Sequence, residues 1–150
     1  MKIKIKFLEE KYSKGAIIDH DFFFEMMKAQ MHGCSLIDVP QYKLDEMERK
    51  SKEYLAKEKS LFECYDLNNK GIAYEKEGKL DSAVSVYEKN IALGHPAHHS
   101  FKRLMIIYKK RRDSVNEHRV ILRALDIFPN FNEYVERLDK VNKLVNKSNP

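Results

Sequence analysis

The chain has 150 residues, of which 43% are hydrophobic and 34% charged, and its 28 basic and 23 acidic side chains give a formal net charge of +5. This length is typical of one domain with one core, and the hydrophobic fraction excludes a disordered chain. No segment approaches the run of about 20 apolar residues that spans a bilayer, and the Lys-alternating start lacks the apolar block of a secretory signal. We therefore expect a cytoplasmic protein with no membrane segment.

The positive charge belongs to the C-terminal part of the chain. From Ala97 to Pro150 there are 12 basic and 6 acidic residues, whereas the first 96 residues carry a net charge of −1. This asymmetry favours acidic partners, with nucleic acid as an alternative to protein. Cys34 and Cys64 are separated by 29 residues without a CxxC pair, so we expect two reduced, buried thiols and no disulfide or zinc site.

Residues 1–42 are predicted to form an N-terminal segment with short strands and one apolar helix. Apolar and polar residues alternate over residues 2–7, which predicts a strand, and residues 16–18 are its expected partner. Asp19 and Asp21 are placed to cap a helix over residues 22–31, which is apolar on most sides. Such a helix needs cover on more than one face, so it should pack against the helical domain or another copy.

Residues 43–150 are predicted to form a helical domain. Residues 43–77 contain no proline and read as one long helix or two helices end to end. Further helices are expected over residues 80–93, 97–111 and 113–127, and a last amphipathic helix follows Pro129. Together the two parts give an all-α fold with a short N-terminal strand pair, and we expect one compact unit.

Two stretches of this domain share a pattern at a spacing of thirty-four residues, which separates Tyr74 from Tyr108. The first copy contains Gly71, Tyr74, Ala83 and Tyr87, and the second contains Phe101, Leu104, Tyr108, Ala124 and Pro129. This pattern resembles the tetratricopeptide repeat (TPR) family over about residues 62–129. The second copy departs from the motif at Met105 and Glu117, where small residues let paired helices approach closely.

The resemblance implies stacked antiparallel helix hairpins, a C-terminal capping helix, and a concave surface lined by the first helix of each repeat. Carried onto this sequence, the partner-binding residues are Asn68, Ile72, Lys76, His99, Lys102, Ile106, Lys109 and Lys110. This surface is mixed but leans basic. We therefore expect a module that binds a peptide or partner protein of acidic character.

Two alternatives remain open. Lys109 to Arg112, widened by Lys102, Arg103, Arg119 and Arg123, is a candidate nucleic-acid patch. Alternatively, residues 22–31 and the apolar stripe from Leu44 to Tyr65 would join copies of the chain into a homo-oligomeric scaffold.

No enzyme activity, cofactor or metal is expected. The sequence contains none of the common local motifs of nucleophilic, nucleotide-dependent or zinc-dependent catalysis. His95, His98 and His99 lie close in sequence, but a metal site needs further ligands, so we interpret them as part of a loop between repeats.

Overall fold

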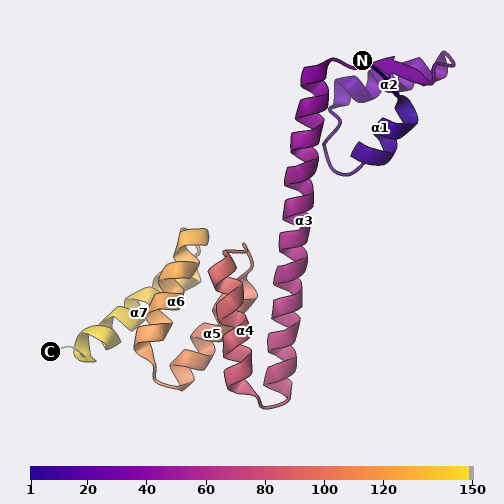
Figure 1. Cartoon of the computed structure of the whole chain (residues 1–150). Coiled ribbons are helices and arrows are strands. Elements are labelled where there is room, and N and C mark those ends of the chain that lie inside the picture. The colour runs from indigo at the N-terminus through magenta and orange to yellow at the C-terminus, as the bar shows by residue number, and fades with distance from the viewer. Residues whose placement is uncertain (149–150) are drawn as a thin grey trace. The chain divides into compact units, whose positions relative to one another are not determined.

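The computed structural model describes residues 1–148 and shows an all-α fold with one short strand pair, which confirms the predicted class (Figure 1). The chain forms two compact units, from Met1 to Lys59 and from Ser60 onward. The boundary falls inside α3 (Gln41–Lys76), which is a single uninterrupted helix. The question of one helix or two over residues 43–77 is therefore settled in favour of one.

The first unit places two short helices and two short strands against the beginning of α3. Its elements are β1 (Lys2–Lys4), α1 (Ile5–Tyr12), α2 (His20–Met31) and β2 (Leu36–Asp38). The strands are antiparallel, with Ile3 opposite Ile37. The core of this unit consists of Ile5, Leu8, Tyr12, Ile17, Phe22, Met26, Val39 and Met47.

The predicted partner of the first strand was wrong. Residues 16–18 are irregular and form no strand, and β1 pairs instead with β2. The first strand also ends at Lys4, because Ile5, Leu8 and Tyr12 fall on one face of a helix and are all buried there. A continued strand would have placed Phe7 on the same side as Ile5, yet Phe7 is exposed.

Helix α2 begins and ends where local chemistry predicts. The Asp19 carboxylate accepts a hydrogen bond from the Phe22 backbone N–H at 2.8 Å, and Gly33 takes the positive φ of 77° that follows the helix. Cys34 comes next and is exposed in this turn, so the expectation of two buried thiols was wrong for Cys34 and right for Cys64.

The second unit is built from α3 after Ser60 and four further helices. These are α4 (Leu80–Leu93), α5 (His98–Lys110), α6 (Ser114–Ile127) and α7 (Asn132–Ser148). Gly94 ends α4 with a φ of 74°, and the Asp113 side chain caps α6 by accepting from the Asn116 N–H. The helices predicted over residues 80–93, 97–111 and 113–127 are therefore confirmed.

Helices that follow one another in the chain pack antiparallel, so every second helix runs in the same direction. Ser100 of α5 donates a hydrogen bond to Asn68 of α3, and further along both helices Arg103 pairs with Glu75. On the other layer, Arg119 of α6 pairs with Glu88 of α4. Contacts between residues about one repeat apart therefore tie α3 to α5 and α4 to α6, as in an array of helix hairpins.

The turns after α3 and α5 have the same hydrogen bonds, thirty-four residues apart. After α3, the Gly78 N–H donates to the Glu75 carbonyl and the Lys79 N–H to the Tyr74 carbonyl. After α5, the Arg112 N–H donates to the Lys109 carbonyl and the Asp113 N–H to the Tyr108 carbonyl. In each turn the helix ends at a residue with a left-handed backbone conformation. This residue is Gly78 after α3 and Arg112 after α5.

The two hairpins differ in how closely their helices approach. A Cβ added at Gly71 would lie 2.1 Å from the ring of Tyr87, so α3 and α4 meet at a position that only glycine accommodates. The second hairpin carries Met105 and Glu117 at the places that correspond to Gly71 and Ala83. Both larger side chains are buried, and they lie beside the groove described next.

Candidate functional site

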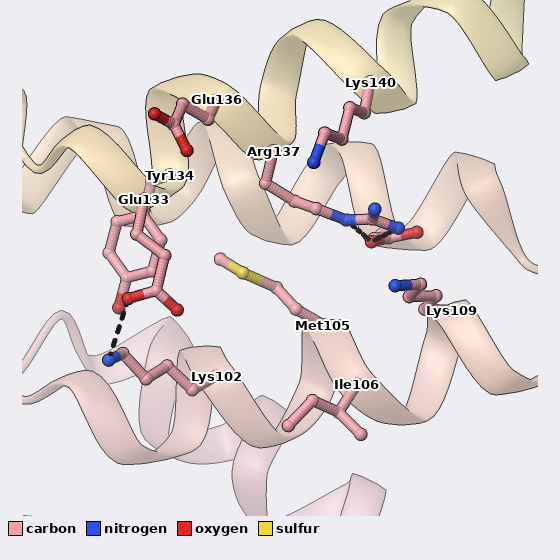
Figure 2. Close-up of a pocket in the computed structure, with 10 residues that line it drawn as sticks. Lys102, Met105, Ile106, Lys109, Glu133, Tyr134, Glu136, Arg137 and Lys140 are labelled. Carbon is pink, nitrogen blue, oxygen red and sulfur yellow. Dashed lines mark hydrogen bonds and ion pairs between the residues drawn. The ribbon is translucent and has the colours of Figure 1, made fainter.

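A groove runs between α5 and α7 in the second unit (Figure 2). It has a volume of about 270 Å³, and α5 contributes Lys102, Met105, Ile106 and Lys109 to its lining. The structure therefore brings together three of the residues predicted from the sequence, namely Lys102, Ile106 and Lys109. Opposite them lies a wall that the sequence interpretation did not include, formed by Glu133, Tyr134, Glu136, Arg137 and Lys140 of α7.

The groove contains apolar surface between its charged walls. Figure 2 shows the Met105 side chain extending between α5 and α7, and the neighbouring Ile106 is partly exposed. Tyr134 is buried, and its hydroxyl lies 2.7 Å from Nδ1 of His98. Burial raises the pKa of Tyr134 to about 12, so this hydroxyl stays neutral at physiological pH.

A buried ion pair joins α6 to α7 at the groove. Glu117 is only 2% exposed, and its Oε1 accepts a hydrogen bond from Nε of Arg137 at 2.5 Å. A carboxylate removed from water requires a close cation and well-directed hydrogen bonds. Arg137 supplies both, so Glu117 is accommodated where the repeat motif has a small residue.

The charges at the end of the groove near the start of α7 compensate one another. Nζ of Lys102 lies 3.1 Å from the Glu133 carboxylate and 5.2 Å from the ring centre of Phe131. The dashed line in Figure 2 marks this Lys102–Glu133 pair, which crosses from one wall to the other. A ligand at this end would have to compete with an ion pair that already exists.

The other end of the groove opens into a second pocket of about 500 Å³, which shares Lys109, Glu117 and Arg137 with the first. Arg112, Ser114, Leu144 and Lys147 complete its lining. Four basic side chains and one carboxylate surround this pocket, which gives it a net charge of +3. The lining of the groove therefore carries its largest excess of basic residues where α5 ends.

Several cations here lack a counter-ion. Within residues 1–148, the ion pairs do not include Lys109, Arg112, Lys140 or Lys147. Other basic residues near them are engaged: Arg103 pairs with Glu75, Arg111 with Asp81 and Arg119 with Glu88. Arg123 donates to the Ile91 carbonyl. Among the described residues, the basic side chains left without an ion-pair partner in this region are therefore mainly those that line the groove. Lys110 lies outside that lining.

Two of the predicted residues lie in the packing between helices. Oδ1 of Asn68 accepts hydrogen bonds from Nδ2 of Asn90 at 2.9 Å and from Oγ of Ser100 at 2.6 Å. His99 packs its ring edge against Tyr87, and burial together with the neighbouring Arg103 lowers the pKa of His99. The polar atoms of Asn68 therefore already have partners inside the stack.

The remaining predicted residues do not line the groove. Ile72 is half-buried on α3, Lys76 is exposed at the end of α3, and Lys110 is exposed at the end of α5. The groove consequently uses the second predicted helix face but not the first.

Of the three histidines interpreted as loop residues, only His95 lies between α4 and α5. His98 and His99 belong to α5, so the interpretation was wrong for these two. Nδ1 of the buried His95 is 2.6 Å from Oγ of Ser60, while the His98 ring stacks on Phe128 with centroids 3.9 Å apart. Among residues 1–148, no three His, Cys, Asp or Glu side chains are arranged to share a metal ion.

The α7 wall was missed because only the apolar face of that helix was considered. Arg137 lies three residues after Tyr134 and four before Val141, so it shares the inward face of the helix with these two buried residues. The sequence signal for this wall was Arg137 on that face, together with Glu117 at a position of α6 where the repeat motif has a small residue. Arg112 gave a weaker signal, because it follows a run of cations that a helix C-terminus favours in any case.

Comparison of the chain with protein-family models, with curated proteins and with solved structures found no match. Across residues 1–148, none of the helices combines the length and the apolar character needed to cross a bilayer.

Proposed function

We propose that this chain is a TPR-like helical-repeat protein that binds an acidic segment of a partner protein in the groove between α5 and α7. The observation that carries the proposal is the pair of Lys109 and Lys140, which lie on opposite walls without ion-pair partners among the described residues, beside the partly apolar floor of the groove. The activity is binding and involves no catalysis.

Membership of the TPR family is part of this proposal. It is supported by the thirty-four-residue spacing of the two helix-ending turns and by the contacts that link α3 to α5 and α4 to α6. The close approach at Gly71 also agrees with the motif. Repeats of this length stack into arrays whose concave surface binds partners.

The floor and the walls would have separate roles. Met105 and Ile106 offer apolar surface, and burial of such surface contributes about 25 cal/mol per Å². Exposed ion pairs contribute only about 0–1 kcal/mol each, so the lysines would act chiefly by selecting negative charge and rejecting basic segments. An extended or helical segment with acidic residues flanking an apolar one matches both features.

A peptide is favoured over nucleic acid by the composition of the α7 wall. Glu133, whose charge is compensated by Lys102, and Glu136 line the groove on that side, so this wall offers a continuous phosphate backbone little attraction. A peptide places its charges individually and needs no such attraction along the whole wall.

The reducing cytosol is the proposed compartment, because the exposed Cys34 thiol is free in the structure.

A second candidate function is self-association through the first unit. Helix α2 exposes Phe23, Phe24, Met27 and Met31, which is a large apolar surface for so short a helix. Such surfaces are frequent at contacts between protein chains.

Charge reversal tests the groove directly. The variant Lys109→Glu/Lys140→Glu changes both walls, and Lys76→Glu/Lys110→Glu makes the same change in net charge at exposed residues outside the groove. Proteins retained from an extract of the native cells would be compared by quantitative mass spectrometry, and peptides of the retained partner would then be titrated. We expect at least about a tenfold loss of affinity in the groove variant, which equals about 1.4 kcal/mol.

The control variant should bind as the wild type does. Equal affinity of both double variants for the partner would contradict the proposal. Ile106→Ser gives an independent check on the apolar floor, since it leaves every charge in place and should also weaken binding.

A further inference from the structure

The pocket at the end of α5 holds more positive charge than its own carboxylate can balance. Arg137 and Glu117 neutralise each other, which leaves Lys109, Arg112 and Lys147. Like charges gathered in one pocket repel, and an anion placed among them relieves this repulsion. A phosphate monoester carries a charge of about −1.5 to −2 at pH 7, so it compensates more of this charge than one carboxylate does.

Arg112 also occupies a backbone position that the fold would fill better with glycine. Its φ is 57°, and Gly78 holds the corresponding place after α3 with a φ of 74°. A residue with a Cβ is disfavoured relative to glycine in this left-handed region. The backbone conformation of the turn therefore favours glycine over arginine, although the C-terminus of α5 favours a cation. Arg112 lines the pocket, and a guanidinium suits the paired oxygens of a phosphate.

From these two observations we propose that the pocket lined by Lys109, Arg112, Ser114 and Lys147 binds the phosphoryl group of a phosphorylated serine or threonine in the partner segment. This inference rests on the proposed function, because it assigns one end of the groove to one group of the bound segment. Binding there is non-covalent, with Arg112 donating to two phosphate oxygens, the lysines supplying charge and the Ser114 hydroxyl a further donor.

The adjoining part of the groove indicates a single phosphate on a peptide. Along the groove the net charge of the lining falls from +3 in the second pocket to +1 in the first, where Glu133 and Glu136 lie. Met105 and Ile106 also lie there. A nucleic acid would bring further phosphates into this part, while a peptide can place uncharged apolar side chains there.

The test is a titration of the full-length, ¹⁵N-labelled protein with inorganic phosphate at pH 7.5, followed by backbone amide chemical shifts. We expect saturable shifts at residues 109–114 and 147. Arg112→Gly should weaken binding about tenfold, the effect of losing one charge-assisted pair, while it relieves the strained backbone and so keeps the protein folded. Lys110→Ala removes the same charge outside the pocket and should change the dissociation constant less than about twofold.

Further ligands separate the possible sources of the anion. Acetate should bind more weakly than phosphate, N-acetyl-phosphoserine amide should bind at least as tightly, and a ten-residue oligothymidine should gain nothing over phosphate per phosphate group. Equal affinity for acetate and phosphate, or an unchanged dissociation constant in Arg112→Gly, would overturn the phosphoryl site. Much tighter binding of oligothymidine would overturn it in favour of nucleic acid.

The two proposals fail in different ways. If phosphate does not bind while Lys109→Glu/Lys140→Glu still loses the partner, only the phosphoryl site is lost. If phosphate binds but that double variant keeps the partner, the groove is not the docking surface for the protein.

Discussion

The two units of the chain differ in how they bury the apolar side chains of their helices. In the second unit, α4, α5 and α6 each have neighbours on more than one side, and one cluster of buried residues runs from Ala83 to Val141. In the first unit, α2 buries Phe22 and Met26 but leaves Phe23, Phe24, Met27 and Met31 exposed. A helix inside a stack has neighbours on several sides, whereas a helix outside the stack leaves a face open or is covered by another chain.

The units also differ in the partly buried or exposed polar contacts between their helices. In the second unit the Tyr87 hydroxyl donates to Glu75, which pairs with Arg103, and the Tyr108 hydroxyl donates to Glu88, which pairs with Arg119. Burial, and then the hydrogen bond to Glu88, raises the pKa of Tyr108 to about 12. Each set ties three helices together. The first unit has one comparable contact, from Tyr12 to Glu48.

The largest predicted effect concerns the ion pair beneath the groove. Arg137→Met should lower the free energy of unfolding by about 3–5 kcal/mol, because it leaves Glu117 buried without its cation. Urea denaturation followed by circular dichroism measures this change. Adding Glu117→Ala restores the small residue of the repeat motif and should recover most of the loss. A double variant as unstable as the single one would mean that the ion pair is not what accommodates Glu117.

The close approach of the first hairpin gives the next effect. Gly71→Ala should destabilise the protein by about 1–3 kcal/mol, since the new methyl group would overlap the ring of the fully buried Tyr87. Alanine otherwise favours a helix over glycine by about 1 kcal/mol, so the sign of the change is informative. Thermal unfolding is the measurement. A more stable Gly71→Ala protein would show that α3 and α4 do not meet at this residue.

Acid should weaken the second unit through His99. Because burial lowers the pKa of His99 in the folded state, the neutral ring is favoured there and the unfolded chain takes up the proton first. The contribution of His99 to stability is therefore fully present above the unfolded pKa of about 6.5 and is lost as the pH falls from there through the lower folded pKa. Tyr87, Arg103 and Glu75 face this ring, and the pKa of Glu75 is lowered by its hydrogen bond to Arg103.

Urea midpoints measured between pH 7.5 and 5.5 avoid the titration of Glu75. His99→Gln should flatten the dependence of the urea midpoint on pH in this range. If the urea midpoint of His99→Gln depends on pH as that of the wild type does, His99 is not the cause of the loss of stability in acid.

The smallest effect on stability is predicted for the open face of α2. Phe24 is 57% exposed and Phe22 is 1% exposed, although they are two residues apart. Phe24→Ser should change the unfolding free energy by no more than about 0.5 kcal/mol, whereas Phe22→Ala should cost about 3–5 kcal/mol. Light scattering of the wild type against Phe24→Ser tests the second candidate function. A monomeric wild type at every concentration would eliminate self-association.

The sequence predicted the second unit better than the first, for a physical reason. Helices there begin and end through local signals such as Gly78, Gly94 and Asp113, which act within a few residues. The pairing of β1 with β2 joins residues more than thirty positions apart, and no local pattern distinguished it from pairing with residues 16–18.

The same limit applied to the groove. Lys102, Ile106 and Lys109 were assigned from the resemblance to the repeat family, but their facing wall on α7 depends on how two helices pack. Asn68 was assigned to the binding surface from its position in the motif. Its hydrogen bonds to Asn90 and Ser100 depend on two other helices and were not visible from that position.

Site-specific crosslinking tests the central claim most directly. A photoreactive phenylalanine at position 106 places the probe in the groove, and the same residue at position 115 places it on an exposed site of α6 that does not line the groove. In an extract of the native cells, we predict that a partner protein is crosslinked from position 106, through an acidic peptide identified by mass spectrometry, and not from position 115. Crosslinks of equal yield from both positions, or from position 115 alone, would contradict the assignment of the groove.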